Sequence, residues 1–302
     1  MMIQWYPGHM YKAKKEFQKI LPQADLVIEV LDARIPFSSQ NPMLAKLRKD
    51  KPCIKLLNKS DLADAAVVSA WQKQLQQDGS VGTLSCNQDD ALLKKLPQLC
   101  RSMIAARKNR STMIYALIAG IPNVGKSTLI NKLAGRHITK TGNEAAMTRM
   151  QQRIEISDEL TLIDTPGMLW PRIENESSGY RLAATGAIRE TAFDLQDVAC
   201  FIADFLRQHY AAAMLERYAL ESMPDTEIEL MEAIAKKRGC IKSGGAIDFE
   251  KISRLLIAEL RCGALGRVCL ETPAMVTREL AQLEIIKAQD AARKAARKAT
   301  KK

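Results

Sequence analysis

The sequence predicts an α/β protein with a mostly parallel sheet and helices on both faces, followed by a small all-α domain. Short apolar, β-branched runs alternate with helical patterns through the first half of the chain, which is typical of a parallel sheet. Beyond about Tyr180 the strand signals end, and apolar residues recur at helical spacing. A glycine-rich loop of the phosphate-binding type connects one predicted strand to the helix after it.

The predicted strands are almost continuously apolar, as expected for strands that are buried on both faces. Helical patterns lie between them, with apolar residues returning every three or four positions. The predicted strands are residues 25–31, 52–59, 81–86 and 112–120 and the runs QRIEI and LTLIDTPG. The helices predicted in the same region are Pro42–Lys49, Ala65–Gln77, Ala91–Arg107 and Lys126–Ala134.

The remainder of the chain predicts further helices and a basic tail. Two of these helices end at glycines, Gly239 and Gly263, and the first of the two ends directly after basic residues, which is a common helix stop. From Lys287 onward the chain has seven basic residues and one acidic residue, a composition that predicts a disordered tail. We therefore expect domains over residues 1–178 and 179–286 and a tail over 287–302.

The composition indicates a polyanionic partner and a reducing compartment. The net charge of +11 and the pI near 9.3 favour nucleic acid or an anionic surface as the partner. The seven cysteines are scattered and form no C-x-x-C pair, which argues against a disulfide framework and against a zinc site. No apolar run reaches the roughly 18 residues of a spanning helix, and the N-terminus lacks a signal-peptide pattern. A cytoplasmic protein without stable membrane association is expected.

The stretch GIPNVGKST carries the most specific motif of the chain. It fits G-x-x-x-x-G-K-[ST] from Gly120 to Ser127, between a predicted strand and a predicted helix. In such loops the backbone N–H groups surround phosphate oxygens, Lys126 would reach the β- and γ-phosphates, and the Ser127 hydroxyl would bind Mg²⁺. The residues expected to contact the nucleotide here are Asn123, Val124, Gly125, Lys126, Ser127 and Thr128.

The run LTLIDTPG supplies the second half of a phosphate site. Asp164 ends an apolar strand, where a carboxylate suits a water-bridged Mg²⁺. Gly167 has no side chain, so its backbone N–H can approach a γ-phosphate. D-x-x-G is a weak signal alone, but the phosphate loop upstream makes it strong.

The motif NKSD, from Asn58 to Asp61, predicts which base is bound. The Asp61 carboxylate can accept hydrogen bonds from N1–H and the 2-amino group of guanine, a donor pair that adenine lacks. Asn58 would support the loop, and the Lys59 stem would cover the base. After the next strand, Ser85 and Cys86 would contact the guanine oxygen through backbone N–H groups.

These elements are those of a GTP-binding G domain, but the base selectors precede the phosphate loop. The sequence resembles the circularly permuted GTPases, and most of all the ribosome biogenesis GTPase A family of bacterial large-subunit assembly factors. The resemblance covers most of residues 5–172, and the helical region after it fits the C-terminal domain of the family. The matching stretches are WYPGHMYKA, DARIPFSSQNP, NKSDL, GIPNVGKST and DTPGMLWPR.

The resemblance implies a GTPase that acts with Mg²⁺ on the precursor of the large ribosomal subunit, slowly alone and faster on the particle. It implies a monomer whose partners are 23S rRNA and ribosomal proteins. The switch threonine of the family should lie between the phosphate loop and Asp164, and Thr148 is the candidate for this role and for binding Mg²⁺. The residues before Thr148 depart from the usual Pro-Gly. Asn123 is a candidate K⁺ ligand, as in similar GTPases; a loop-stabilising asparagine is the alternative.

The permutation gives His9 a candidate role. In an unpermuted G domain the second switch is followed by a helix, which here should be the first helix of the chain, about Met10–Leu21. His9 would then lie at the far end of that switch, near the γ-phosphate. The position after D-x-x-G, where many GTPases have a water-orienting glutamine, is Met168. We therefore expect His9 to orient the attacking water, as the resemblance also implies; a capping or packing histidine is the alternative.

The helical domain is expected to bind RNA and to move with the nucleotide state. A change at residues 167–170 would pass directly into it, since the second switch leads into this domain. The favoured RNA contacts are Lys236, Lys237, Arg238 and Lys242, around Gly239, and further candidates are Arg254, Arg261 and Arg267; a solvated basic face is the alternative. One alternative is a GTP-dependent switch at a membrane or on another ribonucleoprotein, with the basic tail on anionic lipid. A small-subunit assembly GTPase is disfavoured, because this chain has no clustered Cys/His ligands and no room for a barrel before Ala24.

Overall fold

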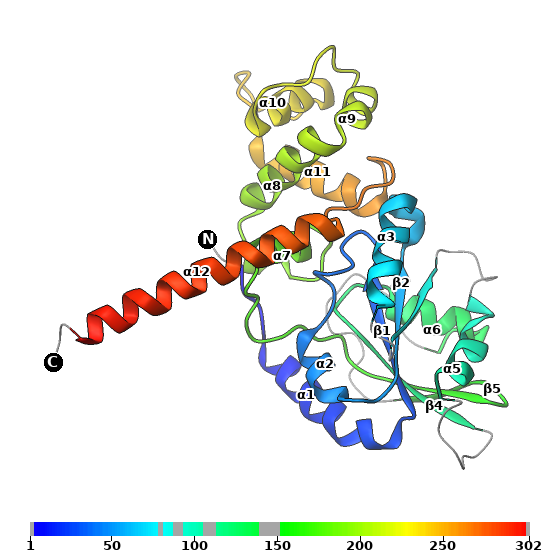
Figure 1. Ribbon diagram of the computed structural model, residues 1–302. Helices are drawn as coiled ribbons and strands as arrows, with labels where there is room; N and C mark the ends of the chain where they lie inside the picture. Colours follow the sequence, from blue (N-terminus) through cyan, green and yellow to red (C-terminus); the bar gives the residue numbers. More distant parts are fainter. Residues whose placement is uncertain (1–2, 78–80, 87–92, 105–112, 139–151, 300–302) are drawn as a thin grey trace.

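The computed structural model describes residues 3–77, 81–86, 93–104, 113–138 and 152–299. A six-stranded sheet forms the core of the first domain, and a cluster of helices packs above one of its ends (Figure 1). A long final helix crosses the junction between the two parts and runs away from the body (Figure 1). Within the described residues, no helix is both long enough and apolar enough to cross a membrane.

The sheet confirms the predicted parallel class. Its order is β3-β2-β1-β4-β6-β5, in which only β5 is antiparallel to its neighbour. Every residue of β1 and β6 is buried, as expected for central strands that are covered on both faces. The strands are β1 Leu26–Asp32, β2 Cys53–Asn58, β3 Val81–Ser85, β4 Ile114–Gly120, β5 Gln152–Ser157 and β6 Leu160–Asp164.

Two helices of the first domain begin after residues whose side chains accept hydrogen bonds from free backbone N–H groups. Asn41 accepts a hydrogen bond from the N–H of Met43, and Asp64 accepts from those of Ala66 and Val67. The helical elements are α1 Gly8–Ile20, η1 Leu21–Gln23, α2 Pro42–Arg48, η2 Ser60–Leu62, α3 Ala65–Leu75, α5 Leu96–Ile104 and α6 Lys126–Ala134.

The first helix begins two residues earlier than expected. Gly8 and His9 were expected to form a loop before a helix at Met10, but they form the first turn of α1. Pro7 is the extended residue before the helix, and it accepts a hydrogen bond from the N–H of Met10. The side chain of Met10 is fully buried, so packing holds this first turn against the domain.

The second part of the chain is helical, as predicted, and is organised around α8. Helices α7, α9, α10 and α11 all contact α8. Thr226 and Glu229 form a reciprocal capping box at the start of α10. The elements are α7 Glu176–Ala184, η3 Glu190–Ala192, α8 Leu195–His209, α9 Ala211–Tyr218, α10 Glu227–Arg238 and α11 Phe249–Cys262.

The C-terminal segment differs from its prediction. Helix α12 runs from Pro273 to Ala299, so residues 287–299 of the expected disordered tail are helical. The segment is rich in Ala, Lys and Arg, which have high helix propensity, and an existing helix extends at little cost. Lys287 forms ion pairs with Glu174 and Glu284 and so fastens the helix at the point where the tail was expected to begin. The boundary expected at residue 178 likewise falls inside α7.

One continuous apolar cluster extends through both parts of the molecule. The N-terminal segment also contacts the link between the two parts. The side chain of Gln4 both donates to and accepts from the backbone of Ile173, at 2.8 and 2.9 Å. Ile3 packs against Gly179 of α7. The start of the chain is therefore fastened to the segment that links the sheet to the helical domain.

Candidate nucleotide site

The carboxyl ends of the parallel strands bring the predicted motifs to one edge of the sheet. In the strand register Asp32 lies opposite Asn58, and Leu57 lies opposite Ser85. Gly120 and Asp164 end β4 and β6 at the same edge. Ligands of open α/β sheets bind outside this edge.

The phosphate loop takes the conformation that its glycines permit. Gly125 precedes α6 with a φ of 93°, in the left-handed region that side chains disfavour. A Cβ atom there would lie 2.4 Å from Nδ2 of Asn58, so any larger residue would collide with the base-selecting loop. The loop therefore presents backbone N–H groups and the positive end of a helix to an anion.

Direct hydrogen bonds join the base-selecting loop to the phosphate loop. Asn58 donates from Nδ2 to the carbonyl of Val124 at 2.8 Å, and Lys59 donates from Nζ to the carbonyl of Asn123 at 2.8 Å. Lys59 itself has a left-handed backbone with a φ of 60°. The two motifs are more than 60 residues apart in sequence, but these hydrogen bonds hold them side by side at one edge of the sheet.

The Ser-Cys segment after β3 completes the base side of the site. The N–H of Ser60 donates to the carbonyl of Cys86 at 3.1 Å, and the Cys86 thiol donates to Oδ1 of Asn58 at 3.4 Å. Asp61 is half-buried in η2, directly after Ser60. The residues predicted to select guanine are thus neighbours in space, as their positions after β2 and β3 require.

The residues expected to hold Mg²⁺ fit a divalent cation. Asp164 is fully buried and accepts a hydrogen bond at Oδ1 from Lys126, while its Oδ2 has no hydrogen-bond partner among the described residues. A buried carboxylate oxygen without a partner is costly unless a ligand binds it. Ser127 lies in the first turn of α6, directly after Lys126. Thr148 lies outside the described residues.

The described residues provide few protein ligands for a metal. Among the described residues no group of three His, Cys, Asp or Glu side chains could hold a metal. One carboxylate and one hydroxyl suit Mg²⁺, which is usually bound by few protein groups together with water and phosphate oxygens.

The segment after Asp164 passes close to the phosphate loop and buries Met168. The side chain of Met168 is fully buried in the core, and its N–H donates to the carbonyl of Gly120 at 3.1 Å. A Cβ on Gly167 would lie 3.2 Å from backbone atoms of Pro122, so the glycine lets this segment pass close to the phosphate loop.

His9 lies where the chain start meets this segment. The neighbouring Met10 accepts a hydrogen bond at its sulfur from the N–H of Leu169 at 3.4 Å. The imidazole is exposed and makes an edge-on contact with Trp5, with 6.2 Å between ring centroids. Partial burial and, to a smaller extent, the positive charge of Arg189 lower the pKa of His9 below its usual value. The imidazole is therefore neutral at pH 7, in the form that can orient a water molecule.

The match to known proteins covers most of the chain. A family model described as 50S ribosome-binding GTPase matches residues 115–236. Ribosome biogenesis GTPase A of Bacillus cereus is 42% identical over 293 residues, which are 95% of this chain and 99% of that protein. The chain belongs to the ribosome biogenesis GTPase A family. It is a GTPase.

More distant relatives share the same arrangement. Mitochondrial ribosome-associated GTPase 1 of Mus musculus is 32% identical, over 89% of this chain and 90% of that protein. The crystal structure of GNP-bound YlqF from T. maritima has a TM-score of 0.62 and 27% identity, and the match covers 87% of this chain and 98% of that chain. The circularly permuted G-domain fold predicted from the motif order is confirmed.

Within this GTPase A framework, two arginines near the site were not predicted. Arg189 precedes η3, is exposed and acts on the charge of His9 from a distant part of the chain. Arg34 lies within the quoted stretch DARIPFSSQNP but had no expected role, and it is fully buried against Asp32. Nothing in the sequence around Arg189 indicates that it approaches His9. Arg34, by contrast, comes two residues after an aspartate that ends a strand, so an ion pair between Arg34 and Asp32 could have been expected.

The four favoured RNA candidates of this GTPase A family member lie together around the end of α10. Lys236, Lys237 and Lys242 are exposed, whereas Arg238 forms an ion pair with Glu259 and lies over the ring of Tyr218. Lys251 was not predicted to belong to this surface; it donates to the carbonyl of Gly239 and adds a positive charge there.

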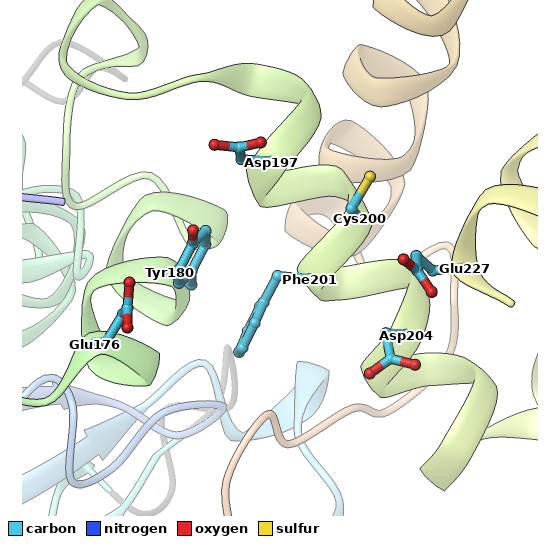
Figure 2. Close-up of a pocket in the computed structure, with 7 residues that line it drawn as sticks. All are labelled: Glu176, Tyr180, Asp197, Cys200, Phe201, Asp204 and Glu227. Atoms are coloured by element: carbon cyan, nitrogen blue, oxygen red, sulfur yellow. The ribbon is translucent and has the colours of Figure 1, made fainter. Parts of the chain in front are cut away.

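A groove of about 550 Å³ between α7, α8 and the start of α10 is separate from the nucleotide site (Figure 2). Tyr180 and Phe201 stack at its centre with ring centroids 5.0 Å apart. Its carboxylates would repel nucleotide phosphates. The acidic residues that line it are Glu176, Asp197, Asp204 and Glu227.

Proposed function

We propose that this GTPase binds the precursor of the large ribosomal subunit in the cytoplasm, as a monomer, and promotes a late step of its assembly. The observation that carries the proposal is a G site with both halves in contact, through Asn58 and Val124, in a chain that matches the family from end to end. The names of its relatives supply the ribosomal context.

The proposed partners are 23S rRNA and ribosomal proteins. The surface that would meet RNA phosphates comprises Lys236, Lys237 and Lys242, with Lys251 beside them. Arg238 belongs to it only in part, since its guanidinium is paired with Glu259. Phosphate contacts of this kind weaken steeply with salt.

For the chemistry, we propose that the chain holds Mg²⁺ through Ser127 and Asp164, with Thr148 as a further ligand. Bound Mg²⁺ would offset negative charge on the β- and γ-phosphates. Lys126 would leave Oδ1 of Asp164 to contact the same phosphates. His9 would orient the attacking water, and Asn123 would provide an oxygen ligand to K⁺.

Replacing His9 with Ala is expected to lower GTP turnover by about 100-fold, because the positioned general base or water-orienting group is lost. Nucleotide affinity should change less than about twofold, since His9 lies outside the base and phosphate loops. In the unsubstituted protein the rate should fall only as the pH drops below the usual histidine pKa, because the pKa of His9 is lowered. Single-turnover hydrolysis from pH 5 to pH 8 measures the loss of rate and the pH dependence.

The matched control is His209→Ala, which removes an exposed histidine from the helical domain. Its turnover should equal that of the unsubstituted protein. Full turnover by His9→Ala, alone and on ribosomal particles, would contradict the role of His9. The same assay in KCl and in NaCl tests Asn123, and equal rates would remove the K⁺ proposal.

Sedimentation of cell extract with a GTP analogue tests the cellular role. The protein should travel with precursors of the large subunit and leave them after hydrolysis is allowed. Recovery with membranes would favour a membrane switch, and recovery with small subunits or another ribonucleoprotein would also overturn the proposal. The variant Lys236→Glu/Lys237→Glu should reduce co-sedimentation and its salt dependence, whereas Lys73→Glu, on α3, should not.

A further inference from the structure

Asn123 of the phosphate loop is held at two of its polar groups. Its carbonyl accepts a hydrogen bond from Nζ of Lys59, and its side-chain Nδ2 donates to the carbonyl of Gly186, each at 2.8 Å. Its backbone has a φ of 57°, a conformation that few residues other than glycine adopt. Both the backbone and the amide of Asn123 are thus fixed from outside the phosphate loop.

The first of these contacts continues into the helical domain through buried charges. Lys59 also donates to Oδ2 of Asp32 at 3.1 Å, and the Arg34 guanidinium donates two hydrogen bonds to Asp32, at 2.9 and 2.8 Å. The other end of the Arg34 guanidinium donates to the carbonyl of Leu260 in the last turn of α11, at 3.1 Å. Although burial alone would raise it, Arg34 and Lys59 hold the pKa of Asp32 well below its usual range.

The second contact of Asn123 continues into the same helix. Arg261, the residue after Leu260, donates to the carbonyls of Ala184 and Ala183 at 2.9 and 3.0 Å. Its guanidinium covers Gly186, where a Cβ would lie 3.5 Å from it. Arg261 therefore holds the backbone segment to which the Asn123 amide donates.

The two paths close a ring because they end on consecutive residues of α11. We propose that Arg34 and Arg261 are positioning residues for GTP hydrolysis, which couple the orientation of α11 to Asn123 and so to the phosphate loop. The coupling rests on the GTPase activity alone and not on the ribosomal partner. In Figure 1, α11 lies on the side of the helical domain that faces the sheet, as this role requires.

We expect the ring of contacts to break abruptly, not gradually, when α11 shifts. Asp32 and Arg34 are buried, so a shift of α11 that removes the carbonyl from Arg34 leaves buried donors unpaired. The same shift withdraws Arg261 from Ala183 and Ala184. A partner that displaces the helical domain therefore loosens both holds on Asn123 together, whereas the docked helix keeps the loop in one geometry.

Arg261→Gln tests this inference on the full chain with single-turnover GTP hydrolysis. We expect the rate to fall about tenfold while GDP affinity changes less than about twofold, because the base-selecting carboxylate of Asp61 is outside the ring. Arg254→Gln is the matched control: Arg254 also lies on α11 and also pairs with Glu190, but no contact joins it to Ala183 or Ala184 among the described residues. Its rate should match the unsubstituted protein.

A double-mutant cycle separates positioning from a general structural effect. Asn123→Ala should also lower the rate about tenfold, and Asn123→Ala/Arg261→Gln should be no slower than either single variant, since both act through one contact. Rates that multiply to about a hundredfold loss would overturn the inference, as would an unchanged rate in Arg261→Gln or an equal loss in Arg254→Gln. Arg261→Lys, which keeps the charge and fewer donors, should give an intermediate rate, and a full loss in it would also count against the ring.

Discussion

Asp61→Asn is expected to weaken GDP binding by at least about 100-fold, because the residue predicted to pair with guanine would lose one of its two matched acceptors. Guanine offers two N–H donors on one edge, and an asparagine amide turns one acceptor into a donor. Xanthine carries an oxygen in place of the 2-amino group, so the variant should gain affinity for xanthosine diphosphate. The loop geometry should persist, since the hydrogen bond between Ser60 and Cys86 is made by the backbone.

Titration of fluorescent GDP and xanthosine diphosphate measures both changes. Asp64→Asn is the control, because Asp64 lies three residues further on and caps α3, a role that asparagine also performs. This control should keep its preference for GDP. Retained GDP affinity in Asp61→Asn would show that another residue selects the base.

Arg181→Met should destabilise the protein by about 3–5 kcal/mol, because it leaves the buried carboxylate of Glu271 and the half-buried one of Glu279 without their cation. Arg181 is 1% exposed and contacts Glu271 at 3.3 Å and Glu279 at 2.8 Å. Glu271 is fully buried and also accepts hydrogen bonds from Ser38. This cluster joins the DARIPFSSQNP loop, α7 and the start of α12, so its loss affects both domains.

Urea unfolding at two pH values measures the effect and its cause. Burial raises the pKa of Glu271 even with Arg181 present, and removing the arginine raises it further. A carboxyl with a raised native pKa loses stability as the pH rises towards that pKa, so the deficit of Arg181→Met should be larger at pH 8 than at pH 5. Arg181→Met/Glu271→Gln should recover part of it.

The control is Arg254→Met, which breaks two exposed ion pairs and should cost less than about 1 kcal/mol. A deficit of that small size in Arg181→Met would contradict the role of the cluster.

The sequence predicted well those features that depend on local pattern. The strands that carry Asn58, Gly120 and Asp164 were predicted from apolar runs, and α6 begins and ends at the predicted residues. The contact of the chain start with the segment after Gly167 followed from the motif order, because the permutation leaves only one partner for that helix. Local signals failed for Gly8 and His9, where burial of Met10 extends the helix through a sequence that resembles a turn.

Contacts between distant segments were beyond reach of the sequence. Arg34 and Arg261 are separated by more than 200 residues, and nothing in the spacing of either one indicates that they serve the same loop. Arg189 similarly approaches His9 only after the helical domain has packed. Such pairs are selected by the geometry of the fold, so they become visible only when its backbone is known.

The final helix has the geometry of a lever. It is held near its start by Arg181 and, further along, by Lys287 on Glu174, and the twelve residues after that extend about 18 Å beyond the anchor. A rotation of about 10° at the anchor would move the tip by about 3 Å, as far as a hydrogen bond is long. A small repacking around Arg181 would therefore displace the cationic end of the helix by a measurable distance, far from the nucleotide site.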